Sequence, residues 1–98
     1  MDIKQLRDNI DRIDGELVSL FAERMEITAE IAKYKAENSL PVFDEARELE
    51  VLNGVISTVP EHLEGYAITL YKTIFDVSRS YQETLNETDS VLGNTTED

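Results

Sequence analysis

Cysteine and tryptophan are absent from this 98-residue chain, and histidine occurs only once, at His62. A chain without cysteine can form neither a disulfide framework nor a thiolate metal site. A single histidine does not by itself predict a metal site. We therefore expect a protein that uses no metal ion.

Glycine and proline are scarce, with four and two residues, so the chain has few predicted breaks. No segment alternates between polar and apolar residues as a half-buried strand would. No apolar run approaches the roughly 18 residues of a membrane span. The start, MDIKQLRDNI, lacks the charged-then-apolar layout of a signal peptide. These absences predict a cytoplasmic protein that does not enter a membrane.

Basic residues are also few: 9 Lys and Arg stand against 21 Asp and Glu, which gives a net charge of −12. Nucleic acid and anionic membrane surfaces attract basic footprints, so neither is an expected partner. A small anionic ligand remains possible, because a few basic residues are enough for it if they gather in one place.

The 3.6-residue helical period dominates what is present. It predicts an all-α fold of three helices, at about residues 2–38, 44–58 and 60–87, in one domain at 1–87. Pro41 should end the first helix, because a residue before proline disfavours helical geometry. Asp44 is suited to cap the second helix. Residues 88–98 are polar, acidic and aperiodic, and we expect them to form a flexible tail.

The first predicted helix is too long for a compact chain of this size. At 1.5 Å per residue it extends about 54 Å, whereas a domain of this length has a radius of gyration of roughly 13 Å. Its apolar stripe continues along the whole length and needs a cover. The stripe consists of Ile3, Leu6, Ile10, Ile13, Leu17, Leu20, Ile27, Ile31 and Tyr34. We therefore predict an intertwined homodimer in which the long helices pair; a plain coiled coil is the simpler alternative.

An arginine interrupts this stripe, because Arg24 stands where the next apolar residue is due. Lys35 is eleven residues later, close to three turns, and so points the same way. Buried cations need a counter-charge. One interpretation is that Arg24 pairs with an acid of another helix, such as Glu48, or extends its head to water. The other is that the missing anion is a ligand, and that polar Ser78 and Gln82, one turn apart, face the same site.

Four segments in order resemble the all-helical chorismate mutases of the bacterial AroQ class. They are LRDNIDRID, LVSLFAERMEI, IAKYKAENSLPVFDEARELEVL and IFDVSRSYQ, and the resemblance covers about residues 3–86. It implies an intertwined homodimer of three-helix chains. It also implies an enzyme without cofactor or metal that rearranges the chorismate dianion to prephenate, on the route to phenylalanine and tyrosine.

The resemblance also implies a role for each of eight residues. Catalysis would rest on four of them: Lys35, Gln82, Arg24 and Glu48. Lys35 and Gln82 would donate to the ether oxygen of the substrate, and Arg24 would bind a carboxylate. The substrate-binding set would be Arg7 from the partner chain, Arg24, Lys35, Asp44, Arg47, Glu48, Ser78 and Gln82, with Ile31 as an apolar wall.

Two other functions fit the same scaffold. Isochorismate pyruvate lyase and aminodeoxychorismate mutase resemble this family and share the arginines and the lysine. A non-catalytic regulatory or dimerisation module is the alternative outside enzymology, although the chain keeps all eight polar residues.

Overall fold

The computed structural model describes residues 1–96, with side chains for residues 1–87, and it contains three α-helices. These are α1 (Ile3–Glu37), α2 (Glu45–Thr58) and α3 (Glu64–Thr96), with a short 3-10 turn, η1 (Glu61–Leu63), before α3. The predicted three-helix, all-α fold and the long first helix are confirmed. The helix α3 runs past Glu87, where the pattern predicted its end. The predicted flexible tail, residues 88–98, lies outside the described side chains and stays a prediction.

The ends of α1 are set by local hydrogen bonds. At the start, Asp2 and Gln5 form a capping box, in which each side chain accepts from the backbone N–H of the other at 2.8 and 3.0 Å. At the end, Ser39 adopts a positive φ of 55°. Leu40 N–H donates to the Lys35 carbonyl at 2.8 Å, as in a Schellman motif. The helix therefore ends before Pro41, through a left-handed residue as well as the proline.

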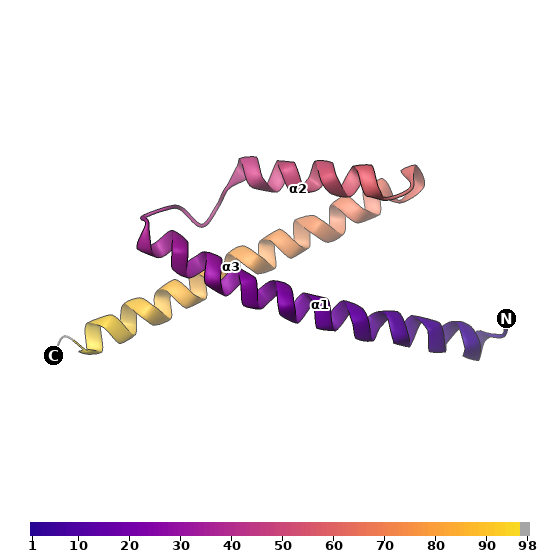
Figure 1. Cartoon of the computed structure of the whole chain (residues 1–98), viewed down its shortest axis with the longest axis horizontal. Coiled ribbons are helices and arrows are strands. Elements are labelled where there is room, and N and C mark those ends of the chain that lie inside the picture. Colours follow the sequence, from indigo (N-terminus) through magenta and orange to yellow (C-terminus); the bar gives the residue numbers. More distant parts are fainter. Residues whose placement is uncertain (97–98) are drawn as a thin grey trace.

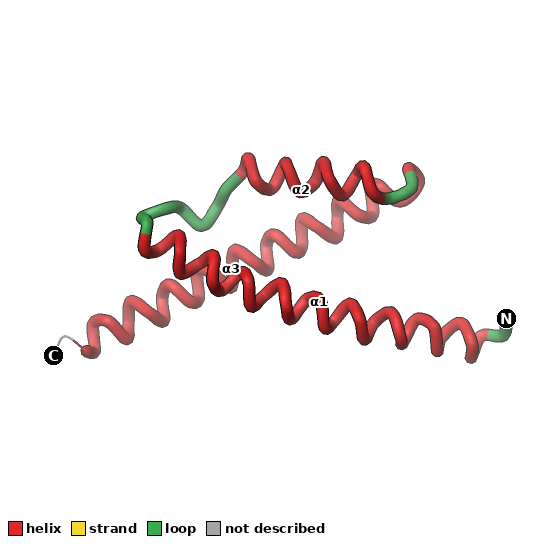
Figure 2. Tube along the Cα trace, in the orientation of Figure 1, coloured by secondary structure: helices red, strands yellow, loops and turns green. Residues whose placement is uncertain are grey.

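The helices α1 and α3 cross, and α2 folds back along the first half of α3 (Figure 1). Loops occupy only short stretches, the longest lying between α1 and α2 (Figure 2). The buried side chains among those described belong to α1 (Thr28 and Ala32) and to α3 (Phe75, Ser78 and Gln82). The core of the single chain is thus small, and three of its five members are polar.

The chain is elongated, with a radius of gyration of 17.8 Å and extents of 64 × 30 × 15 Å. The first half of α1 extends away from the other helices toward the N-terminus (Figure 1). Its apolar stripe is uncovered: Leu6, Ile10, Ile13, Leu17 and Leu20 are between 40% and 61% exposed. An apolar surface of this extent is typical of an interaction site. Within residues 1–96, no helix is long and apolar enough to cross a membrane.

Candidate active site

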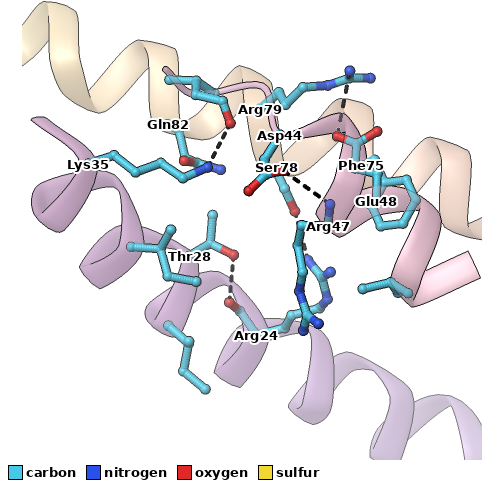
Figure 3. A pocket seen from close by; sticks show the side chains of 14 residues that line it. Arg24, Thr28, Lys35, Asp44, Arg47, Glu48, Phe75, Ser78, Arg79 and Gln82 are labelled. Carbon is cyan, nitrogen blue, oxygen red and sulfur yellow. Dashed lines mark hydrogen bonds and ion pairs between the residues drawn. The ribbon is translucent and has the colours of Figure 1, made fainter. Parts of the chain in front are cut away.

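A cavity of about 470 Å³ lies where the three helices and the loop between α1 and α2 come together. Figure 3 shows side chains from all three helices gathered around it. Its lining residues are Arg24, Ile27, Thr28, Ile31, Lys35, Val42, Asp44, Arg47, Glu48, Val51, Phe75, Ser78, Arg79 and Gln82. Seven of the eight residues singled out in the sequence therefore share one cavity, and Ile31 lines it as expected.

The eighth residue, Arg7, does not reach this cavity. It lies on the projecting half of α1, 17 positions before Arg24, which is about 26 Å along the helix axis. Within one chain it has no route to the site. The expectation that Arg7 serves the pocket of a second chain is not tested by a single chain, and it stays a prediction.

Arg24 is held by α3 and not by a carboxylate. Its guanidinium donates to Ser78 Oγ at 2.8 Å, and its backbone carbonyl accepts from Thr28 Oγ1 at 2.9 Å. Among the described residues, no acid lies within ion-pairing distance of Arg24, so the alternative that Glu48 neutralises it is wrong for this chain. A half-buried guanidinium whose partner is a neutral hydroxyl has remaining donors for an anion.

Lys35 joins α1 to the loop that follows it. Its Nζ donates to the Val42 carbonyl at 2.7 Å. An ammonium has three donors, so two remain for other partners. The Schellman motif at Ser39 turns the chain back over the helix and brings Val42 within reach. The side chain of Lys35 extends into the space beside Gln82 (Figure 3).

Ser78 and Gln82 lie one turn apart on α3, as their spacing predicted, and both are buried, at 8% and 6% exposed. The Oε1 atom of Gln82 is buried without a hydrogen-bond partner. Leaving such an atom unpaired costs about 1–3 kcal/mol. An unpaired amide oxygen at the wall of a cavity marks a polar side chain whose hydrogen bonding the fold itself does not complete.

The N-terminus of α2 supplies the acidic side of the cavity. Asp44 caps the helix, because its carboxylate accepts from the Arg47 backbone N–H at 3.1 Å. The guanidinium of Arg47 pairs with Glu50 on the exposed side of the helix. Glu48, 22% exposed, lies 3.6 Å from Arg79.

Arg79 is the charged lining residue that the sequence reasoning missed. It stands between two predicted site residues, Ser78 and Gln82, in the segment SRSYQ. That position gave a signal, since a basic residue inside a site segment is a candidate for the same site. Ile27, Thr28, Val42, Val51 and Phe75 were missed as well, because apolar and hydroxyl residues carry no sequence mark of a cavity.

The charge of the cavity opposes that of the whole chain. Four basic and two acidic side chains line it, a formal charge of +2 in a chain of −12. The rest of the lining is apolar or neutral, and Arg24 and Lys35 are half-buried, so charges interact more strongly there than in bulk water. Among the described residues, no three His, Cys, Asp or Glu side chains group so that they could hold a metal ion. The arrangement suits a small dianion with hydrogen-bonding oxygens.

The sequence matches the family described as chorismate mutase type II over residues 6–83. The chain belongs to this family. The resemblance drawn from the sequence segments is thereby confirmed, and the matched range contains the whole cavity.

Individual relatives agree with the family. The chorismate mutase of Methanocaldococcus jannaschii is 25% identical over 83 residues, which cover 83% of this chain and 84% of that protein. The bifunctional chorismate mutase/prephenate dehydratase of Escherichia coli (strain K12) is 35% identical over 82 residues, or 82% of this chain and 21% of that protein. The T-protein of Haemophilus influenzae is 40% identical over 50 residues, or 51% of this chain and 13% of that protein. The chain thus spans less than a quarter of the T-protein and the bifunctional enzyme.

Proposed function

We propose that this protein is a chorismate mutase, which rearranges chorismate to prephenate in a pocket shared between two chains. The observation that carries the proposal is one cavity that gathers Arg24, Lys35 and Gln82, in which no acid of the described residues pairs with the arginine. Membership of the chorismate mutase type II family supports it. The E. coli relative, named for both a mutase and a prephenate dehydratase, supports a place in the synthesis of aromatic amino acids.

Binding energy in such a site would come from the arginines. A guanidinium grips a carboxylate through two parallel hydrogen bonds and keeps its charge at any physiological pH. Arg24 would give up or share its hydrogen bond to Ser78 Oγ and bind one carboxylate of the substrate. Arg47 would support the binding of that carboxylate. Holding both ends of a flexible molecule favours its compact, reactive conformer, and such positioning can lower the barrier by several kcal/mol.

The chemical step would be driven by donors aimed at one oxygen. In this rearrangement the ether C–O bond breaks as a new C–C bond forms, and negative charge grows on the ether oxygen. Lys35 and Gln82 lie beside each other in the cavity (Figure 3). An ammonium and an amide N–H directed at that oxygen stabilise the transition state more than the ground state. No proton transfer, covalent intermediate or cofactor is required.

The hydroxyl group of the substrate would lie toward α2. Glu48 presents a carboxylate to the cavity, and Asp44 begins the helix beside it. A carboxylate accepts a hydrogen bond from a hydroxyl, and a substrate without that hydroxyl would leave it unpaired. Glu48 would therefore favour chorismate over analogues that have no hydrogen-bond donor at this ring position.

The second chain enters through α1. The uncovered stripe, the projecting half of α1 and the distance of Arg7 from its own cavity support an intertwined homodimer. In a two-fold pair, the projecting half of one α1 covers the partner and brings the partner's pocket within reach of Arg7. Arg7 would then bind the second carboxylate and close the pocket.

The deciding experiment is the loss of chorismate, followed by ultraviolet absorbance. Prephenate is then identified by its acid conversion to phenylpyruvate. Rapid loss with prephenate as product is the expected result. A folded dimer that leaves chorismate intact would overturn the proposal. Isochorismate and aminodeoxychorismate, assayed in the same way, would then distinguish the lyase and the amino-substrate mutase from a module without activity.

A further inference from the structure

Arg79 of α3 has partners on three different elements. Its guanidinium lies 3.6 Å from Glu48 of α2 and 2.5 Å from Asp76, one turn earlier on α3. Its central carbon lies 5.0 Å from the centre of the Phe43 ring, in the loop before α2. At this distance a guanidinium and an aromatic face attract each other. Figure 3 shows the contact between Arg79 and Glu48 at the top of the cavity.

The ion pair with Glu48 differs from the others in the described part of the chain. Arg12–Glu16, Arg47–Glu50 and Arg79–Asp76 each join residues three or four positions apart on one helix. Arg79–Glu48 joins two helices, and both side chains are less than one third exposed. A pair with this burial is screened less by water and salt than a surface pair.

The element that carries Glu48 needs such an anchor. The helix α2 has no buried residue of its own, and it is the wall of the cavity opposite α1. Lys35 holds the preceding loop from the side of α1, through the Val42 carbonyl. Arg79 holds the next residue, Phe43, from the side of α3. The loop at residues 38–44 is thus clamped between two cations, one of which also fixes Glu48.

We propose that Arg79 is a positioning residue, which acts on the reaction by holding the Glu48 carboxylate and the 38–44 loop against the cavity. A glutamate side chain has several rotamers and would leave the cavity for water in the absence of this cation. The planar guanidinium suits the role better than an ammonium, because it offers a flat face to Phe43 and edge donors to Glu48. The inference rests on the proposed function, in which Glu48 contacts the substrate.

A double-mutant cycle on kcat/KM tests this role. Arg79→Gln should lower kcat/KM for chorismate about tenfold, a coupling within the range measured for contacting residues. In a Glu48→Gln background the same change should cost clearly less than about tenfold, because the carboxylate that Arg79 positions is gone and only its contact with Phe43 of the loop remains to be lost. A residue with a purely structural role would lower kcat/KM by the same factor in both backgrounds, and that result would overturn the proposal.

Two further variants sharpen the test. Asp76→Asn removes the local partner of Arg79 and leaves Glu48 and Phe43 in place, so it is the matched control and should change kcat/KM less than about twofold. Arg79→Lys keeps the charge but loses the flat face and the paired N–H donors of the guanidinium. Its kcat/KM should lie between those of wild type and Arg79→Gln. If Arg79→Gln does not fold, the same cycle is run with Arg79→Lys.

A measurement that needs no turnover separates the clamp from the proposed function. Amide hydrogen exchange at residues 39–48 should be faster in Arg79→Gln than in Asp76→Asn, because the loop and the start of α2 lose their anchor. If the wild-type protein does not convert chorismate, the proposed function fails, and exchange alone decides on the clamp. The same holds if Glu48→Gln is too slow to assay. Equal exchange in the two variants would overturn the proposal.

Discussion

Gln82 is a residue whose burial works against stability. Its Oε1 atom lies in the interior without a partner, which costs about 1–3 kcal/mol. Replacing Gln82 by leucine removes this unpaired atom and keeps a similar volume. We expect Gln82→Leu to leave the free energy of unfolding unchanged or to raise it by about 1 kcal/mol, while kcat falls about 100-fold or more. Thermal unfolding and steady-state kinetics measure the two effects.

A neighbouring exposed position provides the control for Gln82. Glu83→Gln changes the next residue of α3 and should alter neither stability nor rate. A Gln82→Leu variant that is clearly less stable and fully active would show that the amide serves the fold rather than the ligand.

Lys35 is the cation expected to act on the ether oxygen. Lys35→Ala should lower kcat by about 10²–10³, as the loss of a donor aimed at a developing charge does elsewhere. Its hydrogen bond to the Val42 carbonyl disappears as well, so the unfolding temperature should fall slightly. Lys33→Ala, at an exposed position of the same helix, is the matched control and should keep near-wild-type turnover. Full turnover in Lys35→Ala would refute the assignment.

The helices were predictable because their signals are local. The 3.6-residue period, Asp44 as a cap and the breaks near Pro41 and Pro60 located all three helices. The cavity was largely predictable too, because Arg24 interrupts an apolar stripe and helical spacing aligns it with Lys35. Each of these features depends on residues within about three helical turns of one another, so the sequence alone reveals it.

What could not be predicted depends on how the elements meet. Arg79 stands beside Glu48 and Phe43 because the loop after α1 turns at Ser39, a residue with no sequence signal for a left-handed conformation. The same geometry explains why Glu48 pairs with Arg79 and not, as one interpretation had it, with Arg24. Pairings between helices are decided by packing, and a single sequence carries no record of them.

The C-terminus of α1 offers a test at the scale of the element. Ser39 has a φ of 55°, a conformation that costs an L-residue roughly 1–2 kcal/mol and suits glycine. Glycine removes this cost, but it loses more conformational freedom on folding than serine does, which offsets part of the gain. We therefore expect Ser39→Gly to raise the free energy of unfolding by about 1 kcal/mol. Ser39→Ala keeps the Cβ atom, so it is the control and should not raise the free energy of unfolding. Chemical denaturation measures both, and a destabilised Ser39→Gly would contradict this description of the turn.

At the scale of the whole molecule, the apolar stripe of α1 predicts self-association. Leu17 is 56% exposed in the single chain, so a charge there has little to disturb within one chain. We expect Leu17→Asp to convert a dimer into a monomer with little activity, because a buried unpaired charge is very costly. Sedimentation or light scattering measures the mass. Ser19→Asp, about 200° further around the helix, is the control and should stay dimeric.

Mixing two inactive variants tests whether the pocket is shared. Arg7→Ala and Lys35→Ala should each be nearly inactive alone. Random exchange of equal amounts makes half of the dimers mixed, and each mixed dimer has one intact pocket if Arg7 serves the partner. Activity should then recover to about a quarter of the wild-type value per chain. An absence of recovery, with exchange verified by mass, would place Arg7 outside the partner's pocket.

The single crossing of α1 and α3 has a consequence for how the protein reaches its working form. Helices of this kind form within microseconds, since their hydrogen bonds span only four residues. Much of the apolar surface of α1 is exposed in the single chain. In the proposed dimer, the slow step of folding is therefore a collision between chains, whose rate rises with their concentration. A newly made chain would then have formed its helices but would lack a complete pocket until it associates with a second chain.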